Sequence, residues 1–274
     1  MNPIFSSKLI VKPFVFIFIV LVFTFQSCKK EEIAQNSLKG KLKIEKILGG
    51  GGGEYYFGYN PDHQVSIFAQ SFQGRRISQE LPKYKDGFLT EVAVATLGSS
   101  DQIFNLFLTK LYSYENNNVS EIKEVLKGQV VSNGYTPMNY EFEYDSENKL
   151  KSLKQEHAIL GEKELLRELF IQTDTRGNII KLTTKAYSDG VLIGTIEGEY
   201  EYDDKVNPKY KLYDPAQILE YFSPNNWIKY KVTQTSGPEI KISRSFEYNS
   251  ANLPVKIYSD VSGTMKLSNE YEYY

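Results

Sequence analysis

The sequence predicts an all-β protein in which repeated hairpins form an antiparallel meander, and this meander makes one large curved sheet or barrel. Short stretches that alternate aromatic and acidic residues recur along the chain, and Asp, Asn or Gly residues typical of turns stand between them. The aromatic content, with 21 tyrosines and 16 phenylalanines, agrees with strands, because aromatic side chains pack well on a pleated, half-buried surface.

The recurring unit has an aromatic residue at every second position and ends on an acidic or amide residue. From Tyr114, the next equivalent positions are 144, 173 and 202, at intervals of 30, 29 and 29 residues. A regular period of this length indicates a repeat architecture. The clear copies are 140–145, 200–203, 246–249 and 271–274, and the weaker copies are 57–60, 112–115 and 170–174.

Each unit predicts a pair of strands. In 140–144 the aromatic side chains share one face, and Glu141 and Glu143 share the other. The Asp or Asn that follows favours a turn through its own side-chain hydrogen bonds, and a second alternating strand such as 180–186 comes next. Two strands per unit predict about 14 to 16 strands. Dipeptides that favour tight hairpins are Asp189-Gly190, Asn133-Gly134, Ser236-Gly237 and Ser262-Gly263.

Two segments interrupt this rhythm. Residues 207–224 contain Asp214-Pro215, which predicts a short helix near residues 215–222 with Asp214 as its N-cap and Pro224 as its stop. Residues 155–169 have helical propensity, but the repeat spacing survives on both sides of them. We therefore expect a hairpin around Gly161 there.

The N-terminal segment has the parts of a secretory signal. The apolar run 13–25 follows Lys8 and Lys12 and precedes Ser27-Cys28. The run is shorter than the roughly 20 residues of a comfortable membrane span. Cys28 is the only cysteine, and as first mature residue it makes the segment resemble a bacterial lipoprotein signal, whose thiol carries acyl chains such as palmitate. We therefore expect a signal peptide at 1–27, a lipid-anchored tether at 28–40 and a repetitive β domain at 41–274.

The residues after the cysteine bear on the location. Lys29, Lys30, Glu31 and Glu32 are similar to the surface-export tag of some Gram-negative lipoproteins. This resemblance implies an outer-membrane lipoprotein that is exposed on the cell surface. The alternative is a solvated tether on a protein that faces the periplasm.

Charge and cysteine content limit the partners. Cleavage before Cys28 leaves 274 − 27 = 247 residues with a net charge of (32 − 2) − 34 = −4. This balance argues against nucleic acid, which requires a basic surface. With Cys28 acylated there is no disulfide, so a hydrophobic core must supply the stability. The oligomeric state stays open.

The layout as a whole is similar to known families. The Tyr-x-Tyr-Asp units resemble the tyrosine-aspartate (YD, Rhs-type) repeats. The lipid cysteine, the repeated hairpins and the late helix before Trp227 resemble a family of uncharacterised Gram-negative lipoproteins with a porin-like fold. The resemblance implies the fold and the location, and it brings no catalytic residues.

The sequence offers no catalytic set, cofactor motif or metal-ligand spacing. His63 and His157 are the only histidines, and neither has a partner at the spacing of a metal site. Asp203-Asp204 with Asn207 could hold calcium, but a turn is favoured because acids do not recur at every second residue. The glycine run 49–53 predicts a flexible hairpin loop, since a phosphate loop needs Gly-Lys-Ser/Thr before a helix. Trp227 is a weak candidate for ligand contact.

These observations favour a non-enzymatic lipoprotein that binds or scaffolds partners, such as glycans or envelope proteins. A carrier of a hydrophobic ligand is the alternative, with a closed barrel lined by Tyr200, Tyr202, Phe246 and Tyr248. A transmembrane barrel and a carbohydrate hydrolase with a glutamate pair are further alternatives. Against the hydrolase, we expect the glutamates at 197, 199 and 201 to face solvent opposite lysines of neighbouring strands.

Overall fold

The computed structural model describes residues 43–49, 52–97, 104–127, 136–159, 162–212, 214–235, 237–260 and 263–274. The predicted signal peptide and tether lie outside the described residues, and with them Cys28, Lys29, Lys30, Glu31 and Glu32. The hairpin signal Asn133-Gly134 also lies outside them, as do Gly161, Ser236, Ser262 and part of the glycine run.

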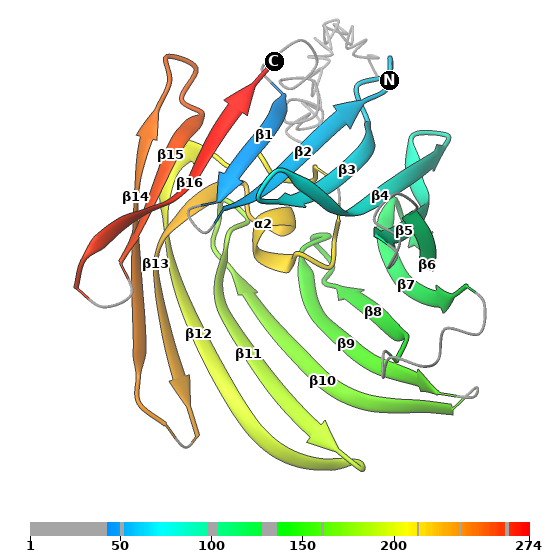
Figure 1. Ribbon diagram of the computed structural model, residues 1–274. Helices are drawn as coiled ribbons and strands as arrows, with labels where there is room; N and C mark the ends of the chain where they lie inside the picture. Colours follow the sequence, from blue (N-terminus) through cyan, green and yellow to red (C-terminus); the bar gives the residue numbers. More distant parts are fainter. Residues whose placement is uncertain are drawn as a thin grey trace, which may run out of the picture. The chain divides into compact units, whose positions relative to one another are not determined.

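The described residues form a closed barrel of sixteen antiparallel strands (Figure 1). Each strand pairs with its neighbours in sequence, and β1 pairs with β16 to close the ring. The predicted all-β meander and the number of strands are therefore confirmed. The strands are β1 Ile44–Gly49, β2 Gly53–Tyr59, β3 Val65–Phe72, β4 Arg75–Lys85, β5 Phe88–Leu97, β6 Phe104–Glu115, β7 Asn118–Leu126, β8 Met138–Tyr144, β9 Leu150–Ile159, β10 Glu162–Thr173, β11 Ile179–Ser188, β12 Val191–Val206, β13 Asn225–Gln234, β14 Ile240–Tyr248, β15 Pro254–Asp260 and β16 Met265–Tyr273.

The two ends of the barrel differ. The end that holds the start of β1 and the end of β16 also holds the segment 207–224, which connects β12 to β13. We call 207–224 the plug and this end the plugged end. The opposite end carries the connections after the odd-numbered strands. We call it the open end, because the inward-facing Ile196 and Ile240 near it remain 40% and 39% exposed.

Four turns at the plugged end repeat one hydrogen-bond pattern. Asp145 accepts the backbone N–H groups of Glu147 and Lys149 through Oδ1, at 2.8 and 2.9 Å. Equivalent bonds to residues two or four positions on are made by Asn60, Asp174 and Asn249. The predicted turn role of the acidic or amide residue in the repeat is thus confirmed.

The last tyrosine of several repeat units joins neighbouring hairpins at the same end. Its hydroxyl donates to a backbone carbonyl near the start of an odd-numbered strand. The bonds run from Tyr144 to Val119 at 2.9 Å, from Tyr202 to Ile179 at 2.8 Å, from Tyr273 to Pro254 at 2.7 Å and from Tyr59 to Ile44 at 3.0 Å. The repeat therefore encodes a link between hairpins as well as a turn.

Inward-facing apolar side chains fill the barrel near the plugged end. Val92, Ile122 and Ile179 are fully buried, and Leu153 is nearly so. Because successive side chains of a strand point to opposite faces, every second residue contributes to this core. The aromatic positions of the repeat provide much of the rest.

The helix begins later than predicted. α2 spans Ile218–Phe222, and Gln217 is its N-cap with no side-chain cap. Asp214 instead forms a separate turn, in which its Oδ1 accepts the N–H of Ala216 at 2.9 Å and its carbonyl accepts that of Gln217 at 3.0 Å. The Asp214 carboxylate therefore bonds one turn before the start of α2 and does not cap the helix. The predicted hairpin within 155–169 is confirmed by the pairing of β9 with β10.

Candidate ligand site in the barrel lumen

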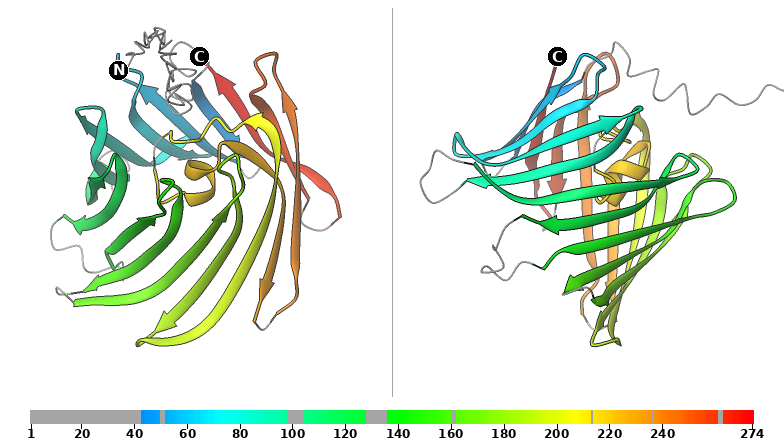
Figure 2. Two further views of the ribbon diagram at one scale, coloured as in Figure 1. Left: turned by 180° about the vertical axis from the view of Figure 1, so that it is seen from behind. Right: turned by 90° about the vertical axis from the view of Figure 1, so that its right-hand side faces the viewer.

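The plug folds into the barrel, where α2 lies inside the ring of strands in both views of Figure 2. Phe222 of α2 contacts the rings of Phe142 and Tyr144 on β8, at centroid distances of 6.2 and 6.5 Å. Ala216 and Leu219 also pack against the buried core. The plug is therefore part of the interior.

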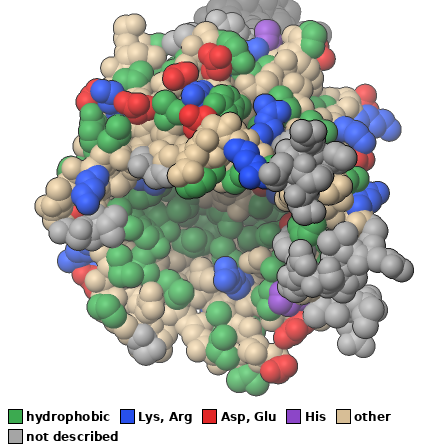
Figure 3. Space-filling model, viewed as in Figure 1, with side chains coloured by type: hydrophobic (Ala, Val, Ile, Leu, Met, Phe, Trp, Pro, Cys, Tyr) green, Lys and Arg blue, Asp and Glu red, His purple; other side chains and the backbone are tan. Residues whose placement is uncertain are grey.

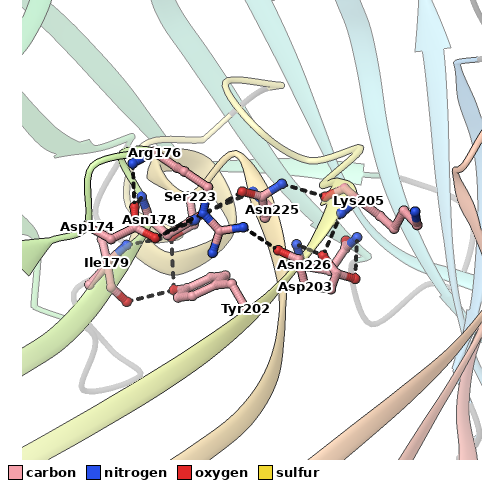
Figure 4. A network of polar contacts seen from close by, with 10 residues as sticks. All are labelled: Asp174, Arg176, Asn178, Ile179, Tyr202, Asp203, Lys205, Ser223, Asn225 and Asn226. Atoms are coloured by element: carbon pink, nitrogen blue, oxygen red, sulfur yellow. Dashed lines mark hydrogen bonds and ion pairs between the residues drawn. The ribbon is translucent and has the colours of Figure 1, made fainter.

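A polar network fixes the root of the plug to the wall (Figure 4). The fully buried Asn178 donates to Asn225 Oδ1 and accepts the N–H of Asn225, both at 3.0 Å. Ser223, also fully buried, accepts the N–H of Ile179 at 3.2 Å and bonds to the hydroxyl of Tyr202 at 3.0 Å. Because all these groups are paired, we expect the network to hold the plug rigidly.

The residues considered for calcium belong to this network. The Asp203 carboxylate accepts the backbone N–H groups of Lys205 and Asn226 and the hydroxyl of Tyr248. The Asn207 side-chain amide donates to the carbonyls of Glu220 and Ser223, both at 2.8 Å. The turn role that the sequence favoured holds for Asn207, whose Oδ1 accepts the N–H of Lys209 at 2.9 Å, but Asp203 and Asp204 lie within β12, which continues to Val206. In the described part of the chain, no group of three His, Cys, Asp or Glu side chains could hold a metal ion.

A buried ion cluster joins the plug to the opposite wall. Lys110 of β6 contacts Asp214 of the plug at 3.0 Å and Glu80 of β4 at 3.8 Å. Burial alone would lower the pKa of Lys110, but the Asp214 and Glu80 carboxylates outweigh it and raise that pKa. The charge of Lys110 is therefore balanced by its neighbours.

Beside the plug lies a cavity of about 270 Å³. Its walls are Ile47, Tyr55, Phe57 and Phe68 of β1–β3, Asn269 of β16, and Lys209, Leu212, Asp214, Gln217, Glu220 and Tyr221 of the plug. Burial alone would lower the pKa of Lys209, but the Tyr271 hydroxyl and the Glu220 carboxylate raise it. The cavity thus combines aromatic walls with a protonated lysine.

Trp227 lies inside the barrel beside a partly buried arginine. The guanidinium of Arg244 on β14 stacks over the Trp227 ring at 3.3 Å from its centroid. The Nε of Arg244 is buried and has no hydrogen-bond partner in the described structure. Burial lowers the pKa of Arg244, while Glu220 and Tyr271 oppose this effect. An arginine remains charged in any case.

The outward face of the barrel is charged. Opposite one another on neighbouring strands, Lys229 contacts Glu201 at 2.7 Å and Lys231 contacts Glu199 at 3.7 Å. Glu197 pairs with Lys181 of β11 at 3.1 Å. These glutamates lie on the outer surface and pair with lysines as expected. The pattern is weakest on β4–β6, where Leu81 and Leu111 are 39% and 41% exposed.

The remaining predicted residues lie apart from the cavity. Tyr200 is buried against Tyr230 at a centroid distance of 4.7 Å, and Phe246 stacks on Tyr248 at 5.7 Å. With Tyr202, these residues fill the wall near the plug root. His63 lies in the first turn of the plugged end, where its Nδ1 is 2.7 Å from Lys43 Nζ, and His157 lies on β9.

Sequence reasoning missed Lys110, Lys209, Asp214 and Arg244 as luminal residues. A signal for two of them exists. Lys110 stands between Leu108 and Tyr112, and Arg244 between Ile242 and Phe246, so each is a cation in an alternating apolar series. A charge at such a position indicates either a buried ion pair or a ligand contact.

Comparison with solved structures finds porin-like proteins. A porin-like protein from Bacteroides vulgatus superposes with a TM-score of 0.58 at 10% identity, covering 85% of this chain and 99% of the other. A porin-like protein from Bacteroides uniformis gives a TM-score of 0.48 at 9% identity, with coverages of 84% and 98%. No family model and no curated protein matches the sequence. The likeness to the Bacteroides vulgatus protein shows a porin-like barrel fold.

None of the helical structure in the described part of the chain has the length and apolar character to cross a bilayer.

Proposed function

We propose that this protein is a non-enzymatic outer-membrane lipoprotein, anchored through acylated Cys28, whose barrel stands outside the bilayer and binds a ligand in its lumen. The observation that carries the proposal is the distribution of side chains. Lysine–glutamate pairs cover much of the outer face, and apolar and aromatic residues face inward.

This distribution is the reverse of that in a membrane-spanning barrel. Spanning barrels present an outward apolar band about 25 Å tall and a polar interior. Charged residues on the lipid face cost roughly 2–4 kcal/mol each near the bilayer midplane. The lysines and glutamates of β11–β13 would add several such costs. A lipid anchor attaches the protein to the membrane without these energetic costs.

The membrane location rests on the N-terminal pattern. Several acyl chains on Cys28 hold a protein firmly, because each buried methylene contributes about 0.8 kcal/mol. The tag-like residues Lys29, Lys30, Glu31 and Glu32 support display on the cell surface. A porin-like fold is compatible with this outer-membrane location.

The test is fractionation of the wild-type protein and the Cys28→Ser variant. We expect wild type in the outer membrane and Cys28→Ser in the detergent-free supernatant, or retained as an unprocessed precursor. A processed Cys28→Ser chain that stays in the membrane until detergent is added would contradict the proposal. Surface display is tested separately by adding protease to whole cells. Replacing Lys30, Glu31 and Glu32 with alanine should protect the protein from protease while leaving it in the membrane.

The apolar lumen supports a more specific form of this function, in which the protein carries a hydrophobic ligand. Figure 3 shows a hollow whose walls are mostly apolar side chains, in the view of Figure 1. We expect mass spectrometry of gently purified protein to find a copurifying amphiphilic or apolar ligand. Protein that is repeatedly empty would leave binding of external partners as the function.

A further inference from the structure

Two inward-facing cations of the barrel wall differ in how their charge is balanced. Lys110 has carboxylates of Asp214 and Glu80 within 4 Å. Arg244 makes no hydrogen bond or ion pair in the described structure, and its Nε is buried. A buried polar group without a partner destabilises the fold, and more so when it is charged. Arg244 is therefore the inward-facing cation whose N–H groups have no acceptor in the described structure.

Arg244 lies near one other cation and one carboxylate. Glu220 interacts electrostatically with both Arg244 and Lys209, so the three groups together carry a net charge of +1. Trp227 holds the guanidinium plane from one side. An arginine fixed in this way suits a carboxylate or phosphate, which its planar fork can bind through two parallel hydrogen bonds.

From Arg244 toward the open end, the inward face becomes apolar. Ile242 and Ile240 follow on β14, and they pair with Tyr230 and Val232 of β13. On β12, Ile196 faces the same way. Ile240 and Ile196 are partly exposed although they face inward, so solvent reaches this wall through the mouth of the barrel.

Small residues leave room along the wall. A side chain added at Gly194 would meet no atom within 4 Å, and Gly194 pairs with Ala186 of β11. At Gly198, in contrast, an added carbon would come within 2.9 Å of the Tyr200 hydroxyl. Aromatic side chains thus cover the wall at Gly198, and the wall at Gly194, nearer the mouth, is uncovered.

We propose that the lumen binds a single-chain anionic amphiphile, with its charged head on Arg244 and its apolar chain along Ile242, Val232, Ile240 and Ile196 toward the open end. This proposal rests on the proposed function only in taking the lumen as the binding site. A carboxylate and a phosphate share the required head chemistry. The plug keeps the ligand from leaving at the other end.

Trp227 is a built-in reporter, because it is the only tryptophan in the sequence and contacts Arg244. We would titrate the Cys28→Ser chain with dodecanoate, dodecyl phosphate and dodecanol and follow tryptophan fluorescence. We expect saturable binding of at least one of the two anions, and binding of dodecanol at least about tenfold weaker, since a hydrogen bond to a charged group contributes about that factor or more. The tighter anion identifies the head group.

Variants locate the site. Arg244→Gln should weaken anion binding about tenfold or more and change dodecanol binding less than about twofold. The matched control is Lys229→Gln on the outer face of β13, which should change neither. Equal affinity for dodecanoate and dodecanol, or no saturable signal with any of the three, would overturn the proposal. The comparison of dodecanoate with dodecanol uses no luminal variant, so it tests the proposal even if Arg244→Gln fails to fold.

The two proposals can fail separately. If the Cys28→Ser chain needs detergent, the proposed location outside the bilayer is wrong. The same titrations are then run in phosphatidylcholine nanodiscs, where the response of Trp227 still compares the anions with the alcohol.

Discussion

The plugged end and the open end of the barrel are built from the same hairpins but are completed in different ways. At the plugged end, side chains of Asp145, Asp174 and Asn249 bind the turns, and tyrosine hydroxyls link one hairpin to the next. At the open end, Val191 and Ile193 beside the Asp189-Gly190 turn are 64% and 67% exposed. The difference indicates that the plugged end contributes more of the stability and that the lumen is accessible from the open end.

The largest expected effect is at the ion cluster of the plug. Lys110→Met removes the cation that contacts the buried Asp214, so we expect the free energy of unfolding to fall by about 3–5 kcal/mol in urea denaturation. The control is Lys229→Met, which removes a pair whose side chains are 60% and 61% exposed and should cost no more than about 1 kcal/mol. Adding Asp214→Asn to Lys110→Met should recover part of the loss. Equal losses for the two lysines would mean that the plug is not held by this cluster.

The next effect is at the root of the plug. Asn178→Ala removes the bonds to Asn225 and Asp174 and leaves a buried N–H without a partner, so we expect a loss of about 2–4 kcal/mol. The comparable change at an exposed position near the open end, Asn105→Ala, should stay within about 0.5 kcal/mol. Thermal or urea unfolding of both variants measures the contrast. A near-neutral Asn178→Ala would show that the network is dispensable.

High pH should weaken the barrel gradually. Burial raises the pKa of the Tyr114 and Tyr140 hydroxyls to about 12. The unfolded chain loses these protons near pH 10 and the folded chain retains them, so the folded state binds more protons between these values. The stability is therefore fully present below about pH 10 and declines as the pH rises toward 12. Urea unfolding at several alkaline pH values measures the slope. Tyr140→Phe should make it shallower, and an unchanged slope would contradict this assignment.

The smallest effect concerns the tyrosine links. Tyr144→Phe removes one hydroxyl bond to the Val119 carbonyl, and we expect a loss of about 1 kcal/mol. Tyr187→Phe is the matched change at the open end, where the hydroxyl donates to Glu168 on the outer surface, and it should cost less. If Tyr187→Phe were the more destabilising of the two, the plugged end would not be the stronger one.

The contrast also explains what the sequence could and could not predict. Turns such as Asp145 with Lys149, and the alternation in 140–144, are local, so their pattern is visible in the sequence. Contacts in the lumen, in contrast, join residues that are far apart in the sequence. Lys110 and Asp214 are 104 residues apart, and no spacing rule indicates that they meet. The helix start was wrong for a related reason, since Asp214 has its carboxylate engaged by Ala216 and by Lys110.

Closure of the ring has a consequence for folding. Pairs such as β2 with β3 join residues close in sequence, but Ile44 pairs with Tyr273 at the other end of the domain. Joining the ends of so long a segment carries the largest loop-closure entropy in the barrel, and distant contacts form slowly. During synthesis, β1 therefore has an unpaired edge until β16 has been translated. Until then this edge is a template for pairing with another chain.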